Sequence, residues 1–233
     1  MRKEPYSTGS YVHIIKRGNR GLPIVRDELD RQRFLLSLMH LNDTHTVENW
    51  FRELDFRDQK SSFTRPSHWQ SQKKLTKIIC FCLVENHFHL LLQETVDKGI
   101  SRFMQKLGTS LAKCYNEKYQ EQGTIFQGAY RSKTVSSDAY LRYVSAYIQV
   151  KNCFEIHPDR KLNSIDDFDE MFDWAMNCPY SSLGNLMGTS KLPIVNQDIL
   201  FEIFTPEDYK EFCADMMAGR LEMELYGSEM TLE

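Results

Sequence analysis

The alternation of apolar and polar residues along the chain predicts a series of strands and helices. Residues 11–16 are predicted to form a strand that ends at the glycine-rich turn 17–21, and an amphipathic helix follows from Asp27. Residues 42–74 are polar and aperiodic, which indicates a long insertion or loop between core elements. The run 78–84 is apolar on both faces, as expected of a central strand that is covered on both sides.

The next segments complete a sheet. Residues 87–93 are predicted to be the hairpin partner of the preceding strand, and residues 100–115 carry apolar side chains at helical spacing. The segment 125–135 is predicted to be extended, and Ser137 is a suitable N-cap for another helix. The order β-α-β-β-α-β-α predicts an α+β fold of the ferredoxin-like, split βαβ class, in which helices back an antiparallel sheet.

The periodicity becomes weaker beyond Pro158. Short helices are predicted around residues 167–176 and 206–217. We therefore expect one domain over residues 1–158, followed by a small helical C-terminal extension over residues 159–233.

Composition excludes several classes of protein. No segment approaches the roughly 18 consecutive apolar residues of a membrane span, and the N-terminus leads into no apolar segment typical of a signal peptide. We therefore expect a cytoplasmic protein without a membrane partner. The six cysteines contain no C-x-x-C pair, which argues against a zinc ribbon and against a disulfide framework.

Charge is distributed unevenly along the chain. Residues 201–233 contain nine acidic and two basic residues, a net charge of −7, so the first 200 residues carry +4 of the total of −3. Residues 102–133 contain six basic and two acidic residues. A locally basic face beside an acidic tail can bind phosphates, although charge alone favours ordinary solvated helix faces.

The triplet His87-Phe88-His89 is the most informative motif. Because side chains alternate along a strand, His87 and His89 share one face, and Phe88 points to the other. Two neutral imidazoles so placed can bind one metal ion. An isolated H-x-H triplet more often consists of one packed and one partly exposed histidine. Its position directly after an apolar strand favours a metal site here.

Three tyrosines share one face of the helix that follows Ser137. Tyr140, Tyr143 and Tyr147 are three and four residues apart, and such aromatic stripes usually pack against a sheet. A phenol has a pKa of about 10 and is a poor nucleophile while protonated. A nearby divalent cation can polarise a phosphate under attack and stabilise the departing oxygen. Tyrosine and a histidine-bound metal are thus a coherent pair for phosphate chemistry.

Taken in order, these motifs resemble those of the REP-associated tyrosine transposases, which are single-tyrosine HUH transposases. The resemblance runs from about Tyr11 to about Gly188. It rests on YVH at 11–13 with RGNR at 17–20, ENHFHLLL at 85–92, IFQGAYRSK at 125–133, DAYL at 138–141 with YIQ at 147–149, and PYSS at 179–182.

The resemblance implies a metal-dependent DNA endonuclease and strand transferase. His87 and His89 would hold Mg²⁺ or Mn²⁺, and Tyr147 would attack a DNA phosphate to give a 5′-phosphotyrosine and a free 3′-hydroxyl. The preferred substrates would be single-stranded DNA ends that fold into hairpins, often palindromic. Residues 1–158 would be the catalytic domain of a monomer or homodimer. Tyr140 and Tyr143 would pack or face DNA.

The sequence departs from the family pattern in three places. Val84-Glu85-Asn86 stands where the family usually has Met-Pro-Asn, and residues 42–74 are longer than usual. The family often has Asn or Gln four residues after the tyrosine as a third metal ligand, but this chain has Lys151, whose ammonium group cannot coordinate. Either Glu85, Asn152 or water supplies the third ligand, or Lys151 neutralises the phosphate directly, or the site is impaired.

Several polar residues are candidates for DNA contact, with simple surface exposure as the equal alternative. Glycines in the first turn would let a phosphate approach the backbone, and cations beside the later strand could follow a phosphate chain while bases stack on Phe126 or Tyr130. The candidates are Arg17, Asn19, Arg20, Gln127, Arg131, Lys133 and Lys151.

Two other functions fit the same motifs. The chain could be a single-strand nucleic-acid-binding module whose metal site is catalytically impaired, which the lysine at position 151 and the acidic net charge favour. It could also be a histidine-metal hydrolase that uses activated water, with Tyr147 only packing.

Overall fold

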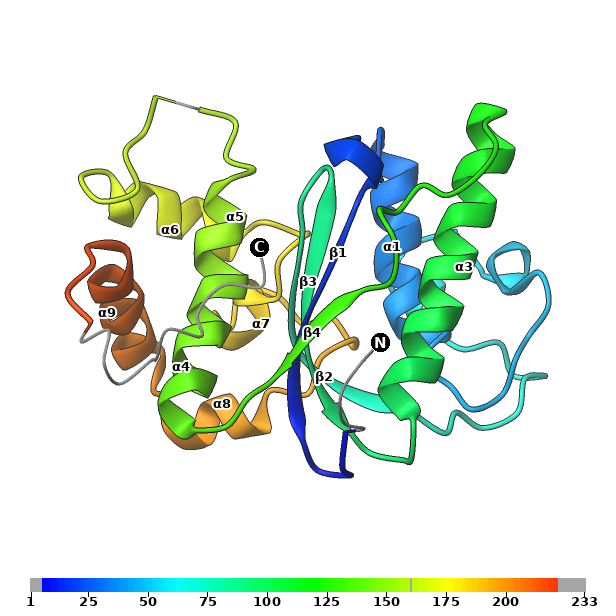
Figure 1. Cartoon of the computed structure of the whole chain (residues 1–233), viewed down its shortest axis with the longest axis horizontal. Helices are drawn as coiled ribbons and strands as arrows, with labels where there is room; N and C mark the ends of the chain where they lie inside the picture. Colours follow the sequence, from blue (N-terminus) through cyan, green and yellow to red (C-terminus); the bar gives the residue numbers. More distant parts are fainter. Residues whose placement is uncertain (1–5, 160, 222–233) are drawn as a thin grey trace.

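The computed structural model describes residues 6–159 and 161–221, which form one four-stranded sheet with helices on both faces (Figure 1). The strands lie in the order β2-β3-β1-β4, and each is antiparallel to its neighbours. Their bounds are β1 (Tyr11–Arg17), β2 (Thr76–Leu83), β3 (His87–Glu94) and β4 (Arg131–Thr134).

The connections define a split βαβ unit. β1 and β2 run in the same direction, and β3 lies between them and is antiparallel to both. The crossover from β1 to β2 contains α1 (Glu28–His40), and α3 (Gly99–Tyr119) connects β3 to β4. The predicted α+β fold of the ferredoxin-like class is confirmed.

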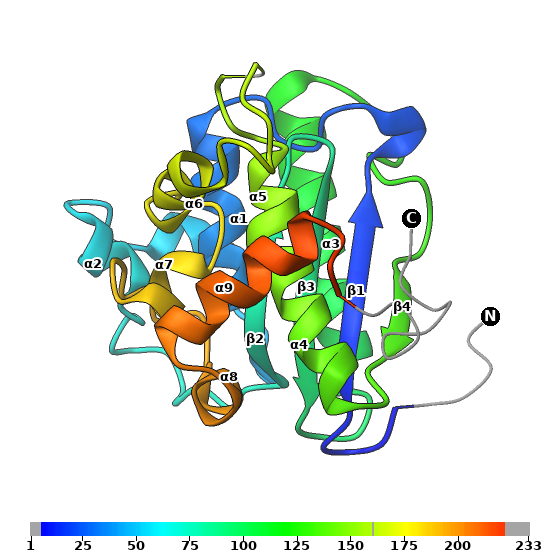
Figure 2. The same cartoon turned by 90° about the vertical axis from the view of Figure 1, so that its left-hand side faces the viewer.

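The helices form two layers (Figure 1). α1 and α3 cover one face of the sheet, and the helix that begins at Ser137 covers the other. Figure 2 shows α9 lying across the outer side of α4, with which it is in contact. The elements of this second layer are α4 (Asp138–Ala146), η3 (Tyr147–Lys151), α5 (Asn152–Phe154), α6 (Phe168–Met176), α7 (Leu183–Met187), α8 (Asp198–Ile203) and α9 (Pro206–Met217).

Strand alternation divides the interior into two hydrophobic cores. Phe88, Leu90 and Leu92 of β3 pack on the α1 and α3 side, whereas Leu91 packs on the α4 side. β1 follows the same rule, because Val12 and Ile14 belong to the first of these cores. Even-numbered residues of both strands therefore face the first core, as the period of two requires.

The long segment between α1 and β2 differs from its prediction as a loop. It contains η2 (Trp50–Glu53) and α2 (Gln59–Phe63), and its aromatic residues Trp50 and Trp69 are buried in the first core. The side chain of Asn42 accepts hydrogen bonds from the backbone N–H groups of Leu75 and Thr76, 3.0 Å each. Irregularly spaced aromatic residues thus give this segment a packed interior that periodicity does not reveal.

The remaining elements agree with the predictions only in part. The extended segment predicted over 125–135 is a strand only in β4, and Phe126 makes an isolated bridge to Gly18. The helix predicted from Asp27 as amphipathic also has an apolar side chain outside the core, because Leu29 of α1 is 50% exposed. A short 3₁₀ turn, η1 (Asn19–Gly21), follows β1. The predicted helices near the C-terminus are present as α6 and α9, whereas α7 and α8 were not predicted.

Some expectations concern residues outside those described. The N-terminal segment 1–5 and the acidic tail beyond residue 221 belong to this group. Within the described residues, no helix is both long and apolar enough to cross a membrane. All six cysteines are free thiols, and five of them are buried.

Candidate active site

His87 and His89 lie together on the α4 side of the sheet. Both are in β3, where the intervening Phe88 is buried in the opposite core. His87 is 3% and His89 is 0% exposed, and their ring centroids are 5.0 Å apart. The predicted shared face is confirmed.

The backbone turn before β3 fixes the orientation of His87. The side-chain oxygen of Asn86 lies 2.7 Å from Nδ1 of His87. Because an amide oxygen only accepts, Nδ1 carries the hydrogen and Nε2 carries the lone pair. A lone pair on Nε2 is what a metal ion would require of this imidazole, and a neighbouring group that orients the ring is usual for such ligands.

A third histidine, His13 of β1, joins this pair. β1 lies beside β3, and His13 is on the same face of the sheet as His89. Nε2 of His13 lies 2.9 Å from Nδ1 of His89, and the two rings are stacked at 5.2 Å. The site prediction missed His13. The available signal was its odd-numbered position between the core residues Val12 and Ile14.

Burial keeps His13 and His89 neutral. The pKa of His13 is lowered to about 3, mainly by burial and further by the charge of Lys133. The pKa of His89 is held well below its usual value, mainly by burial and then by the neighbouring imidazoles and the charges of Arg17 and Lys151. Neutral imidazoles keep the lone pairs that a metal ion requires.

The helix opposite the histidines carries Tyr147 to them. Ser137 caps α4 by accepting a hydrogen bond from the N–H of Tyr140, as predicted. Tyr147 follows the last residue of α4 and is 3% exposed. Its ring centroid is 5.6 Å from that of His89 and 6.0 Å from that of His13. Phenol and imidazoles, 58 residues or more apart in sequence, thus meet at one place.

A π-helical turn changes the register after Tyr147. In η3 the N–H of Asn152 donates to the carbonyl of Tyr147, five residues back. Such turns contain one residue more than an α-helical turn and are frequent at functional sites. The Nζ of Lys151 lies 4.6 Å from the centroid of the Tyr147 ring. Asn152 is 0% exposed, and its amide oxygen and nitrogen have no hydrogen-bond partner among the described residues.

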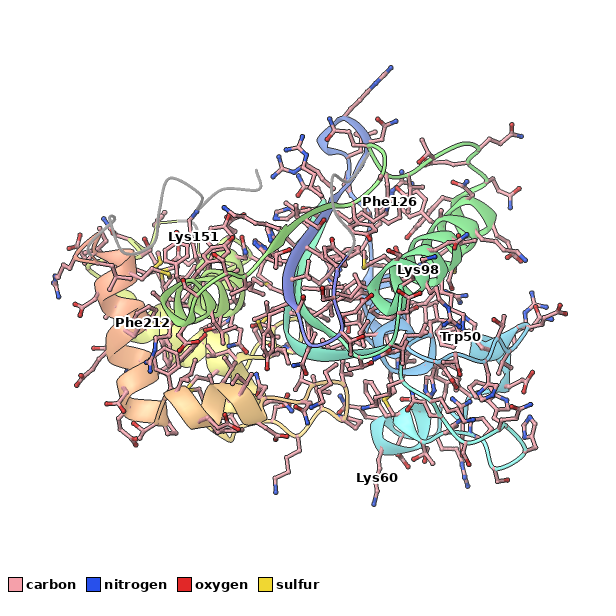
Figure 3. All side chains as sticks on the ribbon, turned by 60° about the horizontal axis from the view of Figure 1, so that its bottom comes forward. Trp50, Lys60, Lys98, Phe126, Lys151 and Phe212 are labelled. Atoms are coloured by element: carbon pink, nitrogen blue, oxygen red, sulfur yellow. The ribbon has the colours of Figure 1, made fainter. Side chains whose placement is uncertain are left out.

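Basic residues surround the histidines and Tyr147. Lys133 pairs with His13 across β4 and β1, and Arg131 pairs with Ile15, so both lie near the site. Figure 3 shows Lys151 on the α4 side of the sheet and Phe126 on the α3 side. Phe126 is 3% exposed and belongs to the first core, so the prediction that bases stack on it is wrong.

The other predicted DNA contacts lie at the end of β1. Arg17 and Arg20 are exposed, and Asn19 is half-buried in the turn η1. The N–H of Gln127 donates to the carbonyl of Arg17, so exposed Gln127 lies beside that turn. Arg17 pairs with His87 across β1 and β3, and its charge contributes to lowering the pKa of His89.

The side chains present fit a divalent cation held by two imidazoles. His87 and His89 offer Nε2 atoms that are buried side by side. Among residues 6–159 and 161–221, no group of three or more His, Cys, Asp or Glu side chains could hold a metal ion. One candidate for a third ligand is the side-chain amide of buried Asn152, whose oxygen is a suitable donor for Mg²⁺ or Mn²⁺. Glu85, the other candidate, is exposed in the turn before β3.

Part of the site lies within a stretch that is similar to known transposases. Residues 55–151 match the family model described as "Transposase IS200 like". These residues, called the IS200-like segment below, are similar to that family. This segment includes both histidines of β3 and Tyr147, and it covers less than half of the 233 residues. The predicted resemblance is confirmed over these residues.

One solved structure is also similar to the chain. It is that of a REP-associated tyrosine transposase bound to a REP hairpin, with 12% sequence identity and a TM-score of 0.46. The similarity covers 83% of this chain and 88% of that chain. No curated protein matches the sequence.

The end of the IS200-like segment is anchored to the C-terminal helices through Gln149. Its side-chain amide donates to the hydroxyl of Tyr209 at 2.8 Å, and its side-chain oxygen accepts from Ser182 at 2.7 Å and from Gln197 at 2.9 Å. The hydroxyl of Ser181 donates to the Gln149 carbonyl at 3.0 Å. Residues beyond 158 thus hold the turn that carries Tyr147.

Proposed function

We propose that this chain is a metal-dependent endonuclease and strand transferase for single-stranded DNA, with Tyr147 as its nucleophile. The observation that carries the proposal is the packing of the Tyr147 ring against His89, 5.6 Å between centroids, across two separate elements. The match of residues 55–151 to IS200-like transposases supports DNA as the substrate. His87 and His89 would hold Mg²⁺ or Mn²⁺ through their Nε2 atoms.

The proposed reaction is a phosphodiester exchange. The Tyr147 oxygen forms a bond to phosphorus, the bond from phosphorus to the 3′-oxygen breaks, and the phenol proton is lost while the departing oxygen gains one. The products are a 5′-phosphotyrosine and a 3′-hydroxyl end. Because the number of phosphoester bonds is unchanged, a second strand's 3′-hydroxyl can reverse the step without ATP. A bound cation would polarise the phosphate and stabilise the departing oxygen.

Residues around Tyr147 would position the phosphate. The Lys151 ammonium lies over the Tyr147 ring and would neutralise the phosphate as it approaches. Asn152, or exposed Glu85, would complete the cation's ligands. Arg17 and Lys133 lie close enough to the histidines to lower their pKa values, and they would bind the neighbouring phosphates.

The proposed substrate is a single-stranded or hairpin DNA end. Arg131, Asn19, Arg20 and Gln127 extend the polar surface beyond the site along β4 and η1. If several phosphates are neutralised, the affinity should fall steeply with salt, with a log–log slope of about −0.7 per phosphate for a single strand. The protein would act in the cytoplasm as a monomer or homodimer.

Covalent trapping tests this proposal. The full chain with Mn²⁺ is incubated with a hairpin oligonucleotide labelled at its 3′ end, since the downstream fragment stays attached to a 5′-phosphotyrosine. A labelled protein band that survives denaturation and disappears in Tyr147→Phe is expected. Tyr143→Phe is the matched control and should retain the band. Cleavage that persists in Tyr147→Phe would instead indicate hydrolysis by activated water.

The lysine over the tyrosine favours one alternative function. An ammonium group so close to Tyr147 occupies the position where the family often has a metal-binding amide, and it supports a binding module with an impaired site. Such a module would retain the oligonucleotide on the protein with neither cleavage nor a covalent band.

A further inference from the structure

His13 lies outside the IS200-like segment, yet it contacts both His89 and Tyr147, the groups proposed to do the chemistry. It is 2% exposed, stacked at 5.2 Å on His89, and in edge contact with Tyr147 at 6.0 Å. The matched segment begins at residue 55, so nothing in that match assigns a role to the first strand. A buried imidazole in β1 with these two contacts needs a physical explanation.

We propose that His13 is a positioning residue that sets the tautomer of His89 and thereby presents Nε2 of His89 to the cation. This inference rests on the proposed function. Nε2 of His13 lies 2.9 Å from Nδ1 of His89, and in the proposed tautomer it accepts the hydrogen of that nitrogen. His13 then orients His89 in the way that Asn86 orients His87. The side-chain oxygen of Asn86 lies 2.7 Å from Nδ1 of His87.

The geometry allows only one hydrogen between the two rings. If it is on His89 Nδ1, the Nε2 of His89 carries a lone pair, whereas if it is on His13 Nε2, the Nε2 of His89 must carry a hydrogen. A neutral imidazole binds a metal only through a lone pair, and Nδ1 of His89 is already engaged with His13. Metal binding through Nε2 of His89 therefore requires this hydrogen-bond direction.

The same contact argues against His13 as a ligand of the cation. Its Nε2 faces Nδ1 of His89, and its Nδ1 is buried without a hydrogen-bond partner among the described residues. Nε2 of His13 is therefore occupied by the contact with His89, and Nδ1 is the ring nitrogen that does not make this contact. His13 acts through His89, as outer partners of metal-binding histidines generally do.

Mn²⁺ binding without DNA tests the inference on the full chain. His13→Leu removes the acceptor, and His13→Gln retains one in its amide oxygen. Electron paramagnetic resonance titration with MnCl₂ should show affinity about 10–100-fold weaker in His13→Leu, the range for loss of such a partner. His13→Gln should recover most of that loss. Equal Mn²⁺ affinity in His13→Leu and wild type would overturn the inference.

A second readout needs no substitution at position 13. Nitrogen-15 shifts of the histidines in the wild-type chain, with Mg²⁺ added, should show the hydrogen of His89 on Nδ1. A hydrogen on Nε2 would contradict the inference even if His13→Leu failed to fold. The adduct assay is separate, because a wild-type chain that forms no adduct while Mn²⁺ affinity depends on His13 would overturn only the proposed function.

Discussion

The two faces of the sheet are built from the same strands but are used differently. On the α1 and α3 face, β1 and β3 contribute apolar side chains such as Val12, Ile14 and Phe88. On the α4 face the same strands contribute His13, His87 and His89, and the rings of His13 and His89 contact Tyr147. Because side chains alternate, a strand can be anchored by one face while the other holds polar groups in a fixed arrangement. Stability and chemistry are thus separated residue by residue within β3.

The largest effect should come from the polar face. His89→Ala should lower the rate of adduct formation by about a thousandfold or more, because a metal ion contributes several kcal/mol to such transition states. DNA affinity, measured by fluorescence anisotropy, should change little, since the cations around the site remain. Unchanged nicking in His89→Ala, or in the parallel variant His87→Ala, would contradict the metal assignment.

The adjacent residue should show the opposite behaviour. Phe88 stands between the two histidines in the sequence, but its side chain is fully buried in the other core. There its ring centroid lies 5.1 Å from that of Phe34. Phe88→Ala should lower the free energy of unfolding by about 3–5 kcal/mol, the usual cost of such a cavity. Urea unfolding measures this loss. If Phe88→Ala lowered the free energy of unfolding less than His89→Ala does, the assignment of stability to the α1 and α3 face would be contradicted.

The buried polar network beside the site should have an intermediate effect. Gln149→Leu leaves the hydroxyl of Tyr209 and the side chain of Gln197 without this partner inside the second core. We expect the unfolding free energy to fall by about 1–3 kcal/mol, because buried polar groups that lose a partner are costly. Thermal unfolding of Gln149→Leu beside Gln149→Glu would show whether the hydrogen-bond pattern or the side-chain volume matters. A neutral Gln149→Leu would mean that the network does not anchor η3.

The smallest effect concerns a histidine on the α1 side. Burial lowers the pKa of His40, although a hydrogen bond with the Ser62 carbonyl opposes this shift. In the unfolded chain His40 takes up a proton near pH 6.5, whereas in the folded chain it does so only at lower pH. The contribution of neutral His40 to the free energy of unfolding is therefore present above pH 6.5 and is lost as the pH falls. The slope is at most about 1.4 kcal/mol per pH unit for one histidine.

His40→Gln tests this dependence. Urea unfolding is measured with a chelator present. Below about pH 6.5, the free energy of unfolding of His40→Gln should fall less steeply with decreasing pH than that of the wild type. An unchanged slope would show that His40 does not contribute to this pH dependence.

Strong periodicity made most of the fold predictable. Alternation in β3 and helical spacing in α3 and α4 predicted both the split βαβ sheet and the shared face of His87 and His89. The packed insertion around Trp50 and Trp69 was not predictable, because its aromatic residues follow no period. Tertiary packing alone orders that segment.

The site was predictable only in part. The proximity of Tyr147 to His89 followed from motif order, but the partnership of His13 with a residue 76 positions away depends on strand pairing that no local pattern specifies. The π-helical turn at η3 was also missed, because no residue preference distinguishes it from an α-helical turn. The π-helical turn begins at Tyr147, contains Lys151 and is closed by the N–H of Asn152.

The most direct measurement is to identify which residue becomes linked to DNA. Wild-type protein is incubated with Mn²⁺ and a hairpin oligonucleotide, digested with nuclease and protease, and analysed by mass spectrometry for a nucleotide on tyrosine. The account predicts the nucleotide on the peptide that contains Tyr147 and specifically on that side chain. A nucleotide on Tyr143 or Tyr140, or cleaved DNA with no nucleotide on any peptide, would contradict it.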